Sequence, residues 1–322
     1  MKSVNLKMKP ISGMKSEKFH WFKIALQIKG SVIPAIYNRV LLCGLFGVFI
    51  SLLYYFKFPV SHPIFGNVIP SIVLGLLLVF RTNTAYERFW EGRKCWGNLV
   101  NNVRNLARQI WVSVIEYQPE DREQKISALR LLVAFAVATK LHLRSEPVNS
   151  ELTELLSTNR YFQLKGMNNP PLEVAFWIGD YLEQQYSYQR LSTYQLTAMQ
   201  NLLNSMVDNL GGCERILKTP MPLAYAIHLK QLLLIYCLLL PFQMVNNLGF
   251  WTGAIVALIS FTLFGIEEIG IEIENPFGYD ANDLPLDAIC NTMKLNIEDL
   301  ITLTPSVKSS TASFPSPSQE RE

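Results

Sequence analysis

Residues 67–90 read NVIPSIVLGLLLVFRTNTAYERFW and run from an uncharged apolar segment into an arginine-bearing amphipathic one without a turn signal. This continuity predicts one helix that starts in a bilayer and carries on into water. Ile72, Leu76 and Phe80 recur every four residues along it, so they project from one narrow face that drifts only slightly around the helix axis. If symmetry repeated this face around an axis, it would form a hydrophobic constriction.

The composition is that of a chain divided between membrane and water. Of its 322 residues, 49% are hydrophobic, which is high for a soluble protein, and 17% are charged, which is high for a chain wholly in lipid. The formal net charge of +3 is small and spread over several segments. Nothing in the charge therefore indicates a nucleic-acid partner.

Three long stretches without charged residues locate the membrane spans. They cover residues 40–56, 58–80 and 231–266. A spanning helix needs about 20 mostly apolar residues, so the first two stretches hold one span each, and the third, interrupted at 241–249, holds two. We predict four transmembrane helices, near residues 36–57, 67–81, 224–244 and 249–267.

The loops predict the orientation. Lys and Arg are frequent in residues 1–39 and 81–218, whereas the short loops at 58–66 and 241–249 contain no charged residue. The positive-inside rule therefore places both termini and the middle segment in the cytoplasm. We expect an integral, multi-pass membrane protein.

These features divide the chain into six segments. Near the N-terminus, residues 17–29 are expected to form an interfacial amphipathic helix, with a solvated loop as the alternative. The predicted segments are a cytoplasmic or interfacial N-terminal segment at 1–35, transmembrane helices 1 and 2 at 36–81, a cytoplasmic helical domain at 82–222, transmembrane helices 3 and 4 at 223–267, a cytoplasmic helical segment at 268–303, and a disordered tail rich in Ser, Thr and Pro at 304–322.

Two helices stand out within the middle segment. The stretch LRLLVAFAVATKLHL at 129–143 is continuously apolar over too few residues to span a bilayer, so we expect a buried helix of a cytoplasmic bundle. A second helix, at about 193–209, is expected to end at Gly211-Gly212. It carries a stripe of Met199, Leu203, Met206 and Leu210. Such a stripe is more often a core seam, so by itself it does not indicate a pore.

Seven acidic residues crowd the segment EEIGIEIENPFGYDANDLPLD at 267–287. Oxygen-rich spacing of this kind can hold a hard cation such as calcium. The alternative, which we favour, is that these acids cap helices, pair with arginines of the middle segment or face water.

No catalytic motif occurs in the sequence. The GxxxxGK[ST], GxSxG and HExxH patterns are absent, and the four histidines are too scattered to form the His boxes of membrane di-iron enzymes. The five cysteines lack CxxC spacing and are expected to be reduced or buried thiols. Cys213 with Glu214 and His228 suggests a thiol nucleophile, but a structural cysteine is the favoured interpretation. We expect no enzymatic activity and no cofactor.

Three stretches resemble the bestrophin family, in particular its bacterial and plastid branch: FRTNTAYERFWEGRKCWGNLVNNVRNLARQ at 80–109, LGGCERILKTPMPLAYAIHLKQLLLIYCLLLP at 210–241, and IENPFGYDANDLPLD at 273–287. The resemblance covers about residues 30–300 in order, and the NPFG turn followed by acids is its most distinctive part. It implies an all-α homopentameric ion channel with four transmembrane helices and a helical cytoplasmic domain. The expected location is a bacterial inner membrane or a thylakoid-type membrane.

The resemblance also assigns site residues. In this family the second transmembrane helix lines a hydrophobic neck, and these positions fall on Ile72, Leu76 and Phe80, the same face that the spacing indicates. A cytoplasmic helix supplies a lower aperture, which falls on Met206. Arg81 directly follows the neck and is a candidate charge at the pore mouth, with an ion pair to a neighbouring subunit as the alternative.

A calcium clasp is implied only in part. Animal members build it from the Asn of NPFG and a dense acidic run just after it. Here Asn275, Asp280 and Asp283 match the ends of that pattern, but Tyr279 and the pair Ala281-Asn282 stand where acids are expected. We therefore do not expect calcium activation.

Family members divide over selectivity. Resemblance to animal and plant-type bestrophins implies an anion channel that passes chloride or bicarbonate. Resemblance to some bacterial members implies a preference for monovalent cations. We favour monovalent anions, because Arg81 directly follows the neck and because the N-terminus and the middle segment are basic near the cytoplasmic mouth. A cation channel on the same fold, and a non-channel membrane scaffold or membrane-integral enzyme, are the alternatives. The expected partners are further copies of the chain, membrane lipids and chloride or another monovalent ion.

Overall fold

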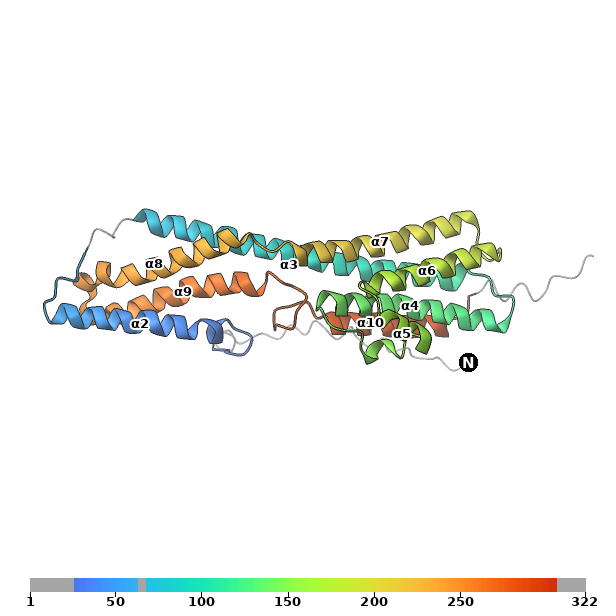
Figure 1. The fold of residues 1–322 in the computed structure, drawn as a ribbon, viewed down its shortest axis with the longest axis horizontal. Helices are drawn as coiled ribbons and strands as arrows, with labels where there is room; N and C mark the ends of the chain where they lie inside the picture. Colours follow the sequence, from blue (N-terminus) through green and yellow to red (C-terminus); the bar gives the residue numbers. More distant parts are fainter. Residues whose placement is uncertain (1–25, 63–67, 306–322) are drawn as a thin grey trace, which may run out of the picture.

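The protein is an elongated bundle of helices organised along one very long helix. The computed structural model describes residues 26–62 and 68–305, and all regular elements within these ranges are helical. Helix α3 (Val68–Ser113) runs through most of the length of the molecule (Figure 1). Its 46 residues extend over about 70 Å at 1.5 Å per residue. The other helices gather at its two ends and form two halves, confirming the all-α fold class.

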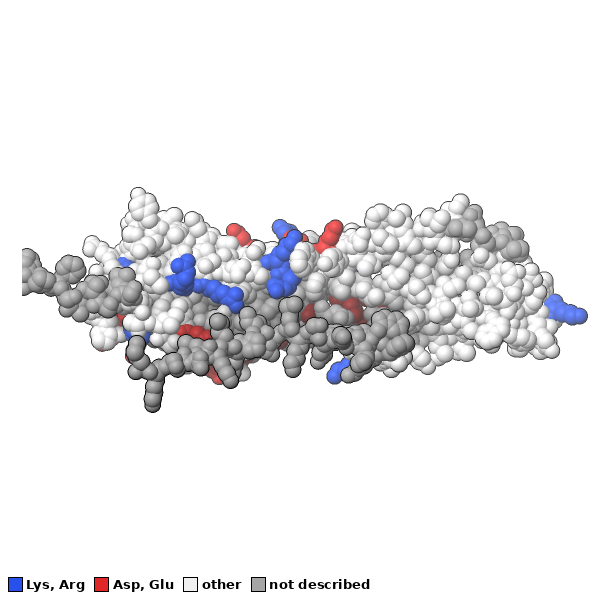
Figure 2. All heavy atoms as spheres, turned by 180° about the vertical axis from the view of Figure 1, so that it is seen from behind, with Lys and Arg blue, Asp and Glu red and all other residues white. Residues whose placement is uncertain are grey.

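The first of these, the membrane half, contains the predicted spans. It consists of α2 (Ile33–Tyr55), the first part of α3, α8 (Leu223–Leu248), the short 3-10 helix η3 (Gly249–Trp251) and α9 (Thr252–Glu272). A small core that includes Leu74, Leu78 and Leu233 holds these helices together, but most of their apolar side chains face outward. The face of this half in Figure 2 is almost free of charged side chains. A helix set whose apolar surface the chain itself leaves uncovered fits a bilayer.

The second, the polar half, is a helical bundle around the rest of α3. Its members are α4 (Pro119–Leu143), the 3-10 helix η2 (Ser150–Leu152), α5 (Thr158–Lys165), α6 (Pro170–Ser187), α7 (Thr193–Lys218) and α10 (Leu286–Thr302). Lysine, arginine and acidic side chains appear on its surface and at its junction with the membrane half (Figure 2). The expected segment boundary at residues 81 and 82 falls inside α3, so one uninterrupted helix joins the two halves.

Helix α4 is long and apolar enough to cross a membrane, yet it is the core of the polar half. In its most apolar window, 78% of the residues are buried by the protein, against 22% to 33% in the windows of the other apolar segments. Trp96, Ile110 and Phe135 are among the fully buried side chains of this core. The four spans predicted from the sequence correspond to α2, the start of α3, α8 and α9.

Close backbone contact joins α2 to α9 in the membrane half. A Cβ atom added to Gly47 would lie 2.9 Å from the Cα atom of Gly253, and one added to Gly253 would lie 2.9 Å from the backbone nitrogen of Val48. Small residues at such crossings let two helix backbones approach without a hydrophobic driving force.

The helix ends correct two sequence expectations. Helix α7 does not end at Gly211-Gly212 but continues to Lys218. Gly212 instead allows close approach to α3, because a Cβ atom there would lie 2.9 Å from the Sγ atom of Cys95. Helix α8 likewise passes through Pro241 and ends only at Leu248, where Gly249 adopts a φ of +53°.

Two other expectations concern the ends of the chain. Residues 26–29 form turns rather than a helix, and the rest of the expected interfacial helix at 17–29 lies outside the described residues. The tail expected at 304–322 also lies outside them from residue 306 onward. The five cysteines are free thiols, and four of them are buried.

Candidate ion pore

The three residues predicted to form a neck lie on one outward face of α3. Ile72 is 64% exposed, Leu76 53% and Phe80 56%, although all three are large and apolar. Leu74 and Leu78, on the other side of the helix, are buried in the core of the membrane half. Because the chain leaves the face of Ile72, Leu76 and Phe80 uncovered, lipid, a further copy of the chain or a dewetted conduit must adjoin it.

Two tyrosines of α8 fix the rotation of α3 about its axis. The Tyr225 hydroxyl donates a hydrogen bond to the Leu77 carbonyl oxygen at 2.8 Å, and the Tyr236 hydroxyl donates to Ser71 Oγ at 3.1 Å. These bonds hold one side of α3 against α8 along its apolar part. The opposite side, which carries the predicted neck, therefore keeps its outward orientation.

Arg81 does not follow Phe80 to the exposed face. Its side chain is buried, its Nη2 lies 2.7 Å from Glu274 Oε2, and its Nη1 lies 2.8 Å from Met221 Sδ. The backbone nitrogen of Met221 donates to Glu274 Oε1 at 2.8 Å. The structure thus corrects both expectations for Arg81, since its ion pair is with an acid of the same chain and its charge does not reach the outward face.

This ion pair holds the Glu274 carboxylate ionised. Burial by itself would raise the pKa of Glu274, but the Met221 N–H and the Arg81 guanidinium outweigh it and keep that pKa below its ordinary value. Glu274 therefore acts as a fixed anion at the junction between the two halves, where α3, α8 and the segment after α9 meet.

Arg88 is a second anchor, and sequence reasoning did not single it out. It lies seven residues after Arg81, so both arginines fall on nearly the same side of α3. Its Nε donates to the Glu274 carbonyl oxygen at 3.2 Å, its Nη2 donates to the Ile216 carbonyl oxygen at 2.5 Å, and its Nη1 donates to the Thr219 carbonyl oxygen. The seven-residue spacing of two arginines, just where the apolar segment ends, is the sequence signal that could have revealed this anchor.

Met206 is a core residue rather than an aperture residue. Its side chain is fully buried in the polar half, together with the rest of the stripe on α7. The exposed positions of α7 are polar, among them Asn201, Asn204 and Asp208. The stripe on α7 therefore forms a core seam, and an aperture made by Met206 would require its side chain to leave this core.

The NPFG turn docks on α3. Phe277 is fully buried, and a Cβ atom added to Gly92 of α3 would lie 2.9 Å from Pro276 Cγ and 3.0 Å from Phe277 Cζ. Asn275 Oδ1 accepts a hydrogen bond from the backbone nitrogen of Phe277 at 3.3 Å. The turn therefore packs closely against a glycine of α3.

The three candidate calcium ligands do not form a cation site here. Asp283 Oδ2 accepts from the backbone nitrogen of Asp280 at 2.8 Å, and Asn275 Oδ1 is likewise used by the backbone. Among the side-chain oxygens of these three residues, Asp283 Oδ1 alone is buried and without a hydrogen-bond partner. Burial raises the pKa of the Asp283 carboxyl. Calcium takes six to eight oxygen ligands, so these side chains do not fit it. Within residues 26–62 and 68–305, no group of three His, Cys, Asp or Glu side chains gathers to hold a metal.

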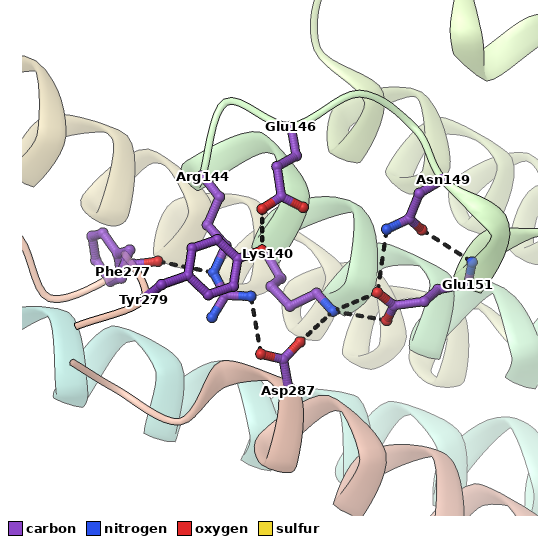
Figure 3. A network of polar contacts seen from close by, with 8 residues as sticks. All are labelled: Lys140, Arg144, Glu146, Asn149, Glu151, Phe277, Tyr279 and Asp287. Atoms are coloured by element: carbon purple, nitrogen blue, oxygen red, sulfur yellow. Dashed lines mark hydrogen bonds and ion pairs between the residues drawn. The ribbon is translucent and has the colours of Figure 1, made fainter. Parts of the chain in front are cut away.

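A polar network around the buried Lys140 ties the segment after the NPFG turn to α4 (Figure 3). Lys140 is almost completely buried, and its Nζ lies 2.7 Å from both Asp287 Oδ1 and Glu151 Oε2. Arg144 Nη1 lies 3.0 Å from Asp287 Oδ2, and Arg144 Nε donates to the Phe277 carbonyl oxygen at 3.1 Å. The Arg144 guanidinium also lies 3.9 Å from the centre of the Tyr279 ring.

The charges in this network support one another. The hydrogen bond from Lys140, opposed by partial burial, lowers the pKa of Asp287. Burial would lower the pKa of Lys140, but its bonds to Asp287 and Glu151 outweigh that effect and raise it. Lys140 and Asp287 are therefore both charged at neutral pH, and they fasten the start of α10 to α4.

Taken together, these features define an integral, multi-pass, all-helical membrane protein whose one continuous helix carries an uncovered apolar face across the membrane half. The chain belongs to the bacterial and fungal bestrophin family: the family model described as "Bacterial/Fungal Bestrophin protein" matches residues 13–299.

Named relatives support the same assignment. The chain is 75% identical to a voltage-dependent anion channel-forming protein of a Nostoc species, over 91% of this chain and 95% of that one. It is 61% identical to a protein of the same description from a Synechocystis species, over 88% and 93%. The crystal structure of a bacterial bestrophin homologue from Klebsiella pneumoniae matches with a TM-score of 0.76 at 31% identity, covering 84% of this chain and all of that one. These descriptions agree with the expectation that the chain is not an enzyme.

Proposed function

We propose that the protein is an anion channel formed by a ring of identical subunits, with Ile72, Leu76 and Phe80 lining a hydrophobic neck. The observation that carries this proposal is the outward apolar face of α3, which the rest of the chain leaves uncovered. Relatives described as anion channel-forming proteins, one of them 75% identical, support the choice of ion.

Oligomerisation follows from the width of this face. A single helix face cannot enclose a conduit, so several copies must place it around a common axis. The family resemblance supplies the number five. The polar half then extends the conduit on the cytoplasmic side of a bacterial inner or thylakoid-type membrane, with both termini on that side.

The neck controls ion flow through desolvation. An ion that sheds water among Ile72, Leu76 and Phe80 finds no oxygen or nitrogen ligands, and the cost is several kcal/mol. Phe80 is the largest of the three side chains. Phe80→Ala should therefore widen and wet the passage and increase conductance or open probability, provided that the oligomer still assembles.

A second candidate, a cation channel on the same fold, is favoured by one residue. Glu87 is exposed, and it lies seven residues after Phe80, which places it within about 20° of Phe80 around the helix. Within the described part of the chain it makes no ion pair. If Phe80 faces the axis, a ring of Glu87 carboxylates lies just below the neck, and it would attract cations.

Reversal potentials of the purified protein in planar bilayers under a potassium chloride gradient decide between the two candidates. We expect a reversal potential near that of chloride, and Glu87→Gln should move it further in that direction. A reversal potential near that of potassium, shifted toward zero by Glu87→Gln, would establish the cation channel instead. The matched control for the neck is Leu258→Ala, because Leu258 is also apolar and 61% exposed but lies on α9 rather than on α3.

A further inference from the structure

A groove opens on the surface of the membrane half, between α2 and α8. Its volume is about 480 Å³, within the range of small-molecule sites in proteins. Leu42 and Phe46 of α2, Leu234 and Leu238 of α8, and Phe264 of α9 form its walls. The lining is therefore apolar over most of its length.

One end of this groove is charged. Arg39, Lys230 and Glu267 line it there. All three lie close to the ends of their helices that adjoin the polar half, where a bilayer would meet water (Figure 1). The groove therefore runs from the membrane boundary toward the bilayer centre.

The two cations at this end are not equally compensated. Arg39 Nη1 lies 3.1 Å from Glu268 Oε2 and 3.5 Å from Glu267 Oε2, so one edge of its guanidinium is engaged. Its Nε and Nη2 have donors to spare. Among residues 26–62 and 68–305, no carboxylate lies within ion-pair distance of Lys230, which is exposed.

The length of the groove matches one leaflet. Lys230 and Leu238 are eight residues apart on α8, which corresponds to about 12 Å along the helix. Half of a hydrocarbon core of about 30 Å is about 15 Å. An acyl chain that starts at Lys230 therefore finds apolar walls for most of the way to the bilayer centre.

We propose that this groove is a binding site for one anionic glycerophospholipid per subunit. Its phosphate binds the ammonium group of Lys230 and the free edge of the Arg39 guanidinium, and one acyl chain lies along Phe46, Leu234 and Leu238. The charge asymmetry selects the occupant, because Arg39 lies within ion-pair distance of Glu267 and Glu268, whereas Lys230 faces Glu267 only from beyond ion-pair distance. A phosphate at the membrane boundary supplies a closer counter-charge in the place where lipid headgroups lie.

The site does not depend on conduction, so it is tested on purified protein. Native mass spectrometry of the intact oligomer in detergent, after addition of phosphatidylglycerol or phosphatidylcholine, measures the bound lipid directly. We expect up to one phosphatidylglycerol per subunit and weaker retention of phosphatidylcholine. Lys230→Ala should weaken phosphatidylglycerol retention about tenfold, the change that corresponds to one charge-assisted contact of ~1.4 kcal/mol. Lys29→Ala is the control, because Lys29 is exposed just before α2 and does not line the groove.

A second pair of variants tests the apolar part. Leu234 and Ile235 are neighbours on α8 and are 51% and 53% exposed, but only Leu234 lines the groove. Leu234→Trp should fill the groove and reduce phosphatidylglycerol retention, whereas Ile235→Trp should leave retention unchanged.

Two outcomes would overturn the proposal. In the first, wild-type protein and the Lys230→Ala variant retain both lipids equally, which means that lipid binding is unspecific. In the second, no lipid is retained and Leu234→Trp, but not Ile235→Trp, dissociates the oligomer. The groove would then be an interface with a neighbouring copy of the chain.

Discussion

Two helices of this protein, α3 and α4, contain apolar stretches suited to a bilayer, and the chain uses them in opposite ways. In α4, 78% of the most apolar window is buried by other parts of the protein, against 22% in α3. Phe135 of α4 is fully buried in the polar half, whereas Phe80 of α3 is 56% exposed. The same kind of side chain therefore stabilises the monomer in one helix and is left for an external contact in the other.

This difference shows that an apolar stretch does not determine its own environment. Helix α4 is flanked by α3, α6, α7 and α10, which together bury its apolar surface. The first part of α3 contacts α8 and α9 on one side only. Apolar surface that the chain leaves uncovered must be covered by lipid or by another subunit, because exposure to water is unfavourable.

The largest expected effect lies in the core of the polar half. Phe135→Ala should lower the free energy of unfolding by about 3–5 kcal/mol, because it removes a fully buried ring and leaves a cavity. Leu76→Ala, on the uncovered face of α3, should change the stability of the monomer far less. Melting of the two variants in detergent, followed by circular dichroism, tests the comparison. Equal losses of stability would mean that the two helices do not differ as described.

Met206→Ala should be nearly as destabilising, at about 2–5 kcal/mol, because Met206 is fully buried on α7. Ion preference in planar bilayers should remain that of the wild type in whatever fraction still assembles. A variant of unchanged stability with altered selectivity would restore Met206 to the ion pathway.

A smaller loss, about 1–3 kcal/mol, is expected for Gly253→Ala at the crossing of α2 and α9. The added Cβ atom would lie 2.9 Å from the backbone nitrogen of Val48, so the two helices must separate. Gly211→Ala is the matched control, since a Cβ atom there meets nothing within 4 Å. In mid-helix that second change should stabilise the protein by about 0.5–1 kcal/mol. Thermal melting that moves in the same direction for both variants would contradict this packing account.

The smallest effect is expected at the junction of the two halves, where Asp287 meets Lys140 and Arg144. The pKa of Asp287 is lowered in the folded protein, so its stabilising contribution is present above the ordinary pKa of about 3.9 and is lost as the pH falls through the lower, folded value. Because Asp287 is largely exposed, the contribution should stay below about 1 kcal/mol. Asp287→Asn should therefore melt slightly below the wild type at pH 7, with a gap that narrows below pH 4. A gap independent of pH would assign the difference to packing rather than charge.

Sequence patterns predicted the spans well, because the requirement for about 20 apolar residues acts locally. They also predicted the outward neck face, because the four-residue spacing of Ile72, Leu76 and Phe80 is a property of one helix. The predicted end of α7 was wrong, since a glycine pair ends a helix in isolation but permits close packing when a neighbour such as Cys95 approaches. The burial of Arg81 and Met206 was not predicted, because it depends on contacts with segments that are distant in sequence.

The sequence by itself therefore determined the helical class, the continuity of α3 between the two halves and the shared outward face of Ile72, Leu76 and Phe80. Each of these follows from hydrophobic periodicity, which is a local property of residues that are neighbours in the sequence. Only the tertiary structure decided that Arg81 pairs with Glu274, that Met206 is fully buried, and that Lys230 lies at the end of an apolar groove. Those outcomes depend on which distant segments cover a side chain, and that information is absent from any single stretch of the chain.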